Sequence, residues 1–188
     1  EEIRRDGHPA VHYQPDRTRL LLELGRSLRP GDCVLTLGAG NIHEQAASLA
    51  RDIAVLEGLQ QVMGPGECRL YEPLSKHTTL RIGGPAQYWL EPETEEGFAR
   101  VVRHCHTSGV PLFVIGRGSN LLVRDGGIRG VVVYLGRGEF KNLEVRGTQI
   151  TAGAGVRQKE LALAARDAGL GGFEWFEGIP GNVGGALG

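Results

Sequence analysis

A short glycine-rich turn that follows an apolar run offers the clearest chemistry in the chain. Residues 112–115 are apolar and lead into the sequence Gly-Arg-Gly-Ser-Asn at 116–120. Glycines at 116 and 118 can adopt positive φ and have no Cβ, so consecutive backbone N–H groups can converge on an anion. The Ser119 hydroxyl and the Asn120 amide add donors. This chemistry suits a phosphate or pyrophosphate, and the alternative is a glycine-rich turn that binds nothing.

A second glycine-rich loop lies near the other end of the chain. The sequence Gly178-Ile-Pro-Gly-Asn-Val-Gly-Gly-Ala186 flanks a rigid Ile-Pro pair with glycines that leave room for a large flat ligand. The aromatic stretch Phe173-Glu-Trp-Phe176 before it is expected to be core rather than a stacking surface. Two such loops are what an extended dinucleotide needs for contacts to its pyrophosphate and its ring.

The elements that position these loops follow from hydrophobic periodicity. Apolar patterns predict helices near 20–28, 46–59, 98–105 and 161–168, strands at 33–37, 86–90, 112–115 and 131–134, and a hairpin of 143–145 with 149–152. Thr94 is the predicted N-cap of the third helix and Gly109 its end. The predicted fold class is α+β. It has an α/β fragment over 1–62, a linker over 63–72 where Gly-Pro-Gly breaks the helical pattern, and a second domain over 73–188.

Charge and cysteine content exclude several kinds of partner. The formal net charge is −1 and the basic residues are not clustered, so neither nucleic acid nor a membrane surface is expected. Cys33, Cys68 and Cys105 are too few and too scattered for a disulfide framework or a metal site, which predicts a cytoplasmic protein. His104 and His106 point apart on a helix, so no metal is expected there either. No apolar run approaches the ~20 residues of a membrane span.

Glycine is unusually frequent. Of the 188 residues, 30 are glycine, more than twice the usual share of about 7%. The distribution is uneven, since 18 of them lie in residues 116–188. The last third of the chain is therefore expected to consist largely of loops that approach a small-molecule ligand.

Motifs in the first 62 residues resemble the end of the C-terminal domain of UDP-N-acetylmuramate–L-alanine ligases. They are His8-Pro-Ala-Val-His-Tyr13, Leu28-Arg-Pro-Gly-Asp32 and Val34-Leu-Thr-Leu-Gly-Ala-Gly-Asn-Ile42. The resemblance implies that residues 1–62 are the tail of such a Mur ligase. Nothing in the chain matches the ATP-binding domain of these enzymes, so no ligase activity is expected.

A second set of motifs resembles the UDP-N-acetylenolpyruvoylglucosamine reductases, also called UDP-N-acetylmuramate dehydrogenases, over residues 73–188. In order, the motifs are Thr78-Thr-Leu-Arg-Ile-Gly-Gly-Pro-Ala86, Gly116-Arg-Gly-Ser-Asn-Leu-Leu-Val-Arg-Asp125, Ala152-Gly-Ala-Gly155, Gly169-Leu170 and the loop at 178–186. The resemblance implies an FAD-binding fold of the vanillyl-alcohol-oxidase type. It also implies NADPH-dependent reduction of a UDP-sugar, UDP-N-acetylenolpyruvoylglucosamine, to UDP-N-acetylmuramate. This step belongs to peptidoglycan synthesis, and so to cell wall biogenesis, cell shape and cell division.

The same resemblance implies which residues bind FAD. They are Gly116, Arg117, Gly118, Ser119, Asn120, Leu121, Ile179, Pro180, Gly181, Asn182, Val183 and Gly184. Asn182 stands where the family commonly has Ser or Thr, and its amide can still donate a hydrogen bond. The Ser, Arg and Glu that carry catalysis in the family lie beyond the Gly-Gly-Ala motif, so no catalytic residue is assigned in this chain.

Three interpretations remain at this point. The first is the cofactor part of such a reductase, preceded by a ligase tail as in an excerpt of a ligase–reductase fusion. The second is the FAD domain of another oxidoreductase of the same fold, against which the motif at 78–86 argues. The third is a non-catalytic remnant in which the glycine loops only shape the fold.

Overall fold

The structure is a computed structural model that describes residues 11–28, 31–38 and 40–187. The helices are α2 (Arg17–Ser27), α3 (Ile42–Met63), α4 (Glu95–Ser108), α5 (Gln158–Asp167) and α6 (Val183–Ala186), with 3₁₀ turns η1 (Leu74–Lys76), η2 (Gly138–Lys141) and η3 (Glu174–Gly178). The strands are β1 (Gly66–Pro73), β2 (Pro85–Pro92), β3 (Leu112–Ile115), β4 (Ile128–Tyr134), β5 (Leu143–Arg146) and β6 (Gln149–Ala152). Helices and strands alternate irregularly along the chain, as the α+β prediction requires.

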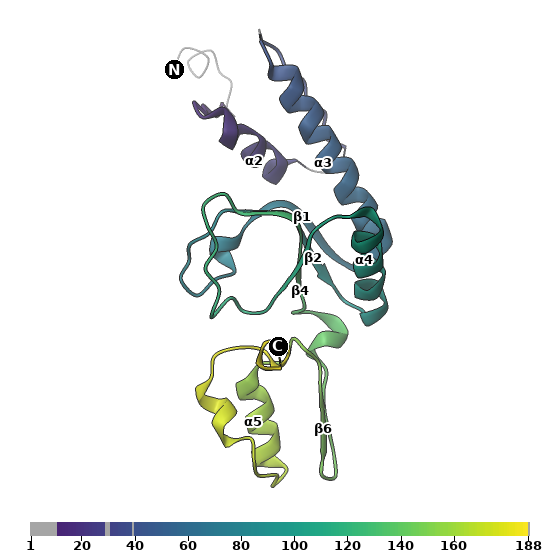
Figure 1. The fold of residues 1–188 in the computed structure, drawn as a ribbon, viewed down its shortest axis with the longest axis vertical. Helices are drawn as coiled ribbons and strands as arrows, with labels where there is room; N and C mark the ends of the chain where they lie inside the picture. Colours follow the sequence, from purple (N-terminus) through teal and green to yellow (C-terminus); the bar gives the residue numbers. More distant parts are fainter. Residues whose placement is uncertain (1–10, 29–30, 39, 188) are drawn as a thin grey trace.

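The larger sheet sets the positions of the glycine-rich loops. Its strand order is β1-β2-β4-β3, with β1 antiparallel to β2 and β4 parallel to both β2 and β3. Figure 1 shows α2 and α3 on one side of this sheet and the β5–β6 hairpin with α5 on the other. The loop at 116–120 follows the edge strand β3, and its Ser119 hydroxyl reaches the Pro180 carbonyl oxygen in the second glycine-rich loop.

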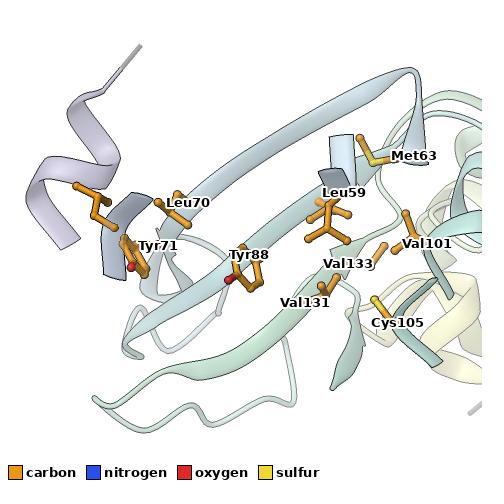
Figure 2. Packing of buried hydrophobic residues seen from close by; sticks show 11 residues of the cluster. Leu59, Met63, Leu70, Tyr71, Tyr88, Val101, Cys105, Val131 and Val133 are labelled. Carbon is orange, nitrogen blue, oxygen red and sulfur yellow. The ribbon is translucent and has the colours of Figure 1, made fainter. Parts of the chain in front are cut away.

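The side chains of β4 divide between two cores, since successive residues of a strand point to opposite faces. Val131 and Val133 pack in the core that α3 and α4 cover, and Val132 packs in a core on the opposite face. In the first core, Leu59 of α3 and Val101 of α4 lie close to the two β4 valines (Figure 2). Leu59 is 1% exposed, so α3 is an integral part of this domain.

Of residues 63–72, expected to be a linker, Met63 ends helix α3 and residues 66–72 lie in strand β1 of the sheet. Helix α3 runs to Met63, and strand β1 begins at Gly66 and pairs with β2 along its length. Arg100 of α4 also donates to the carbonyl oxygens of the last two α3 residues, at 2.7 and 3.0 Å. Gly64 has a φ of 78° and ends the helix. The Gly-Pro-Gly sequence therefore makes a turn within one domain.

The strand predicted at 33–37 does not form in the part of the chain that the structure describes. Leu35 and Leu37 are 77% and 83% exposed, and residues 33–37 pair with no described strand. The expected α/β fragment consists instead of α2 and α3 packed onto β1. Arg26 of α2 donates to the Tyr71 carbonyl oxygen at 2.8 Å. Residues 1–10, 29–30 and 39, which carry parts of the ligase-like motifs, lie outside the described residues.

The start of α4 confirms the predicted cap. Thr94 Oγ1 accepts a hydrogen bond from the Gly97 N–H at 3.0 Å, and Gly109 ends the helix with a φ of 65°. We expect Thr94→Ala to lower the free energy of unfolding by about 1 kcal/mol, because one N–H of the first turn loses its acceptor. Urea denaturation measures this change. Thr107→Ala is the control, since the Thr107 hydroxyl only donates to the Arg103 carbonyl oxygen. An equal loss in both variants would contradict the capping role.

Candidate functional site

The two glycine-rich loops meet in space although they are far apart in the chain. The Ser119 hydroxyl donates to the Pro180 carbonyl oxygen at 2.9 Å, across a sequence separation of 61 residues. Arg157 and Asn182 form an isolated β-bridge beside this contact. Together the loops line a cavity of about 460 Å³, a volume typical of small-molecule sites.

The first loop is held against the segment that follows η1. The Thr79 N–H donates to the Gly118 carbonyl oxygen at 3.0 Å. Gly118 has a φ of 61°, and a Cβ at this position would lie 2.1 Å from the His77 carbonyl oxygen. The positive φ predicted at Gly118 is thus confirmed, whereas Gly116 does not adopt one. Gly118 is required for this close approach of two backbones.

The second loop is held by backbone hydrogen bonds to the segment before α5. The N–H groups of Val183 and Gly184 donate to the carbonyl oxygens of Val156 and Ala154 at 2.9 and 3.0 Å. Val183 and Gly184 do not line the cavity, and their role in binding the cofactor stays a prediction. The predicted residues that do line it are Gly116, Arg117, Gly118, Ser119, Asn120, Leu121, Ile179, Pro180, Gly181 and Asn182.

A second cavity of about 460 Å³ adjoins the first. Both cavities are lined by Gly116, Arg117 and Asn182, so these residues mark their junction. The second cavity is rich in basic side chains. These are Lys76, His77, Arg117, Lys141 and Arg157.

Part of this positive charge is balanced within the protein, since Lys141 and Arg157 share one carboxylate and Lys76 lies 3.5 Å from Glu72. Glu160 lies 3.4 Å from Lys141 and 3.6 Å from Arg157. Burial by itself raises the pKa of Glu160, but the backbone N–H of Arg157 and the ammonium of Lys141 offset this and leave the pKa lowered. The carboxylate is therefore ionised at neutral pH. Arg117 forms no ion pair with any described residue, which leaves its charge for a ligand.

Two buried amide side chains at the first cavity have unsatisfied oxygens. Gln158 and Asn182 are 3% and 5% exposed. Neither Gln158 Oε1 nor Asn182 Oδ1 has a hydrogen-bond partner in the described part of the chain. A buried acceptor without a partner costs about 1–3 kcal/mol. The two oxygens are therefore a local cost to the stability of the fold beside this cavity.

An aromatic side chain also lines the first cavity. Trp175 is 58% exposed and stacks on Phe176, with ring centroids 3.9 Å apart. The expectation that residues 173–176 form core is right for Phe176, which is 8% exposed, and wrong for Trp175. Trp175 and Gln158 line this cavity although no sequence motif marks them. Trp175 could have been suspected from its place beside the second loop, whereas Gln158 carries no signal in the sequence.

No group of three or more His, Cys, Asp or Glu side chains in the described residues is arranged to hold a metal ion. None of the described helices is both long enough and apolar enough to cross a membrane.

A protein-family comparison identifies the class to which this architecture belongs. The family described as "FAD binding domain" matches residues 86–188, which is more than half of the chain. The chain therefore belongs to the FAD-binding domain family. The prediction of an FAD-binding fold with mixed helix and strand content is confirmed.

Several similar proteins of known name are reductases. The UDP-N-acetylenolpyruvoylglucosamine reductase of Desulforamulus reducens is 46% identical over 132 residues, covering 70% of this chain and 43% of the relative. The enzyme of that name from Azorhizobium caulinodans is 48% identical over 122 residues, covering 65% and 39%. The crystal structure of the reductase from Thermus caldophilus superposes with a TM-score of 0.51 at 37% identity, covering 65% of this chain and 41% of that one. The chain spans about two fifths of the length of these relatives.

Proposed function

We propose that this chain is the FAD-binding part of a UDP-N-acetylenolpyruvoylglucosamine reductase. The observation that carries the proposal is the meeting of the two glycine-rich loops at one cavity through the Ser119–Pro180 hydrogen bond. The identities of 46% and 48% to reductases of this name support the choice of substrate. The whole protein would reduce UDP-N-acetylenolpyruvoylglucosamine to UDP-N-acetylmuramate with NADPH, in the cytoplasm, as a step of peptidoglycan synthesis.

The residues present fit FAD. Arg117 at the junction of the cavities carries an unpaired positive charge that suits the pyrophosphate. The cavity lined by Leu121, Trp175 and Ile179 offers apolar and aromatic surface for the flat flavin ring. When bound, FAD supplies the hydride-transfer chemistry, and this chain positions and shields the cofactor. The proposed FAD-binding residues are the ten predicted positions that line the first cavity, with Val183 and Gly184 supporting the loop.

The relation to a ligase is a separate proposal that rests on sequence motifs alone. Helix α3 packs in the core of the FAD-binding domain, through Leu49, Leu59 and Met63. We therefore limit the proposed ligase-like part to the residues before α3. The proposed catalytic residues of the reductase lie outside this chain.

FAD titration tests the proposal directly. At a hundredfold excess over Kd, a ligand that binds only the native state stabilises it by about 2.7 kcal/mol. For a chain of this size, we expect FAD to raise Tm by roughly 5–10 °C and to show a shifted flavin absorption spectrum when bound. NAD⁺ is the control ligand, because it has a pyrophosphate and adenosine but no flavin, and it should bind more weakly. No effect of FAD at any soluble concentration would contradict the proposal and favour a non-catalytic module.

An activity assay on the whole natural protein distinguishes the proposed substrate from others. Oxidation of NADPH should depend on added UDP-N-acetylenolpyruvoylglucosamine. An FAD oxidoreductase of the same fold that acts on an alcohol or hydroxy acid would ignore this substrate.

A further inference from the structure

A buried carboxylate holds the start of the segment on which the first glycine-rich loop rests. Glu72 is 6% exposed and lies near the end of β1, in the stretch that the sequence predicts to be a linker. Its Oε1 lies 2.9 Å from His77 Nε2, 3.4 Å from Arg69 Nη1 and 3.5 Å from Lys76 Nζ. A carboxylate can only accept hydrogen bonds, so the His77 ring donates to it. Three basic side chains thus share one oxygen.

The His77 ring is also held by an aromatic contact. It stacks on the indole of Trp89 in β2, with ring centroids 3.9 Å apart and an interplanar angle of 28°. Trp89 is fully buried, so the ring rests on the core of the larger sheet. Lys76 and His77 line the second cavity, whereas Glu72 does not. Glu72 therefore affects this cavity only through its neighbours.

The segment that follows His77 has a strained backbone and supports the first loop. Arg81 has a φ of 55°, a left-handed value that a residue with a Cβ keeps only where the surrounding structure imposes it. The Thr79 N–H donates to the Gly118 carbonyl oxygen at 3.0 Å. The place of the first loop therefore depends on where residues 77–79 lie.

We infer that Glu72 is a positioning residue for the cofactor site, because through His77 it fixes residues 77–79, the wall against which the first glycine-rich loop packs. This inference rests on the proposed function, namely that the cavities beside this wall bind FAD. Glu72 itself need not contact the cofactor. Without the carboxylate the wall would adopt several placements, and the apparent affinity for FAD falls with the fraction of molecules in the competent one.

Glu72→Gln tests the inference, because the amide keeps the size of the side chain and lacks its charge. We expect the affinity of the chain for FAD, measured by equilibrium titration, to fall roughly five- to tenfold, the difference between a charge-assisted and a neutral hydrogen bond. Hydrogen exchange followed by NMR gives a second readout without the ligand. The Thr79 N–H should exchange roughly five- to tenfold faster, because its bond to the Gly118 carbonyl oxygen opens more often.

Glu91→Gln is the matched control. Glu91 is 5% exposed, lies in the neighbouring strand β2, and also contacts Arg69, at 3.4 Å. It accepts hydrogen bonds from Trp89 Nε1 at 2.8 Å and Arg137 Nε at 2.6 Å, and none of these three partners lines the second cavity. The substitution should leave both readouts unchanged. If Glu72 only stabilised the fold, the two variants would behave alike.

His77→Phe tests whether Glu72 acts through the histidine. Phenylalanine can stack on Trp89 but cannot donate to the carboxylate, so this variant should also lose at least fivefold in affinity for FAD. It keeps the test decisive if Glu72→Gln does not fold. The double variant should bind FAD about as weakly as His77→Phe alone, because both substitutions break the same contact. Losses that multiply would overturn the route through His77.

The outcomes separate the inference from the proposed function. If the unaltered chain binds FAD and Glu72→Gln binds it as tightly, the inference is overturned and the proposed function stands. An equal loss of affinity in Glu91→Gln would also overturn the inference, since the effect would then follow from any buried carboxylate of the sheet. If the unaltered chain does not bind FAD, the proposed function fails, and the inference fails with it.

Discussion

Gly118→Ala is expected to weaken FAD binding roughly 30-fold or more. A left-handed φ costs a residue with a Cβ about 1–2 kcal/mol, and overpacking against neighbouring atoms adds about 1–3 kcal/mol. Gly118 has a φ of 61°, and its added Cβ would lie 2.1 Å from the His77 carbonyl oxygen. The loop must therefore move away from the segment at 77–79, and the cavity loses the wall that this loop provides. Equilibrium titration with FAD measures the effect.

Gly147→Ala is the control that separates the cost of a left-handed φ from the cost of a close contact. Gly147 lies in the turn between β5 and β6, has a φ of 59°, and has open space around its Cβ position. The substitution should lower the free energy of unfolding by about 1 kcal/mol and leave FAD binding unchanged. If Gly118→Ala binds FAD as tightly as the unaltered chain, the contact between the first loop and residues 77–79 does not shape the cofactor site.

Leu59→Ala is expected to lower the free energy of unfolding by about 2–5 kcal/mol, the usual range for emptying a well-packed leucine position. Such a loss is a large part of the roughly 5–15 kcal/mol that stabilises a typical protein. Leu59 is 1% exposed and lies in the same core as Val101 and Val131. Urea denaturation, followed by circular dichroism, gives the change.

The control for Leu59 comes from the same N-terminal part of the chain. Leu35 is 77% exposed, so Leu35→Ala should change the free energy of unfolding by less than about 0.5 kcal/mol. A Leu59→Ala variant as stable as Leu35→Ala would mean that α3 is a separate appendage. That result would restore the linker that the sequence predicts at 63–72.

The errors in the sequence analysis share one physical cause. Residues 33–37 have the composition of a buried strand, but a strand needs neighbours to satisfy its backbone, and the described structure places none beside them. The prediction that the Gly-Pro-Gly sequence at 64–66 ends a helix is correct. Such a turn can join two domains or two elements of one domain, and the strand that follows it decides which. Here the following strand, β1, pairs with β2 of the larger sheet, so the turn lies within one domain. Both errors concern contacts between segments that are distant in the sequence.

The sequence by itself determines two things, namely the local secondary structure and the family that its motifs indicate. Periodicity and capping residues predict α2, α3, α4, α5 and most strands, because these depend on neighbours within one or two turns. The glycine-rich motifs indicate the FAD-binding family and the two loops of the site. Only the tertiary structure brings the Ser119 hydroxyl to the Pro180 carbonyl oxygen and the Val183 N–H to the Val156 carbonyl oxygen. It also leaves Gln158 Oε1 buried without a hydrogen-bond partner among the described residues, because burial and hydrogen-bond satisfaction are properties of the packed chain and have no local pattern.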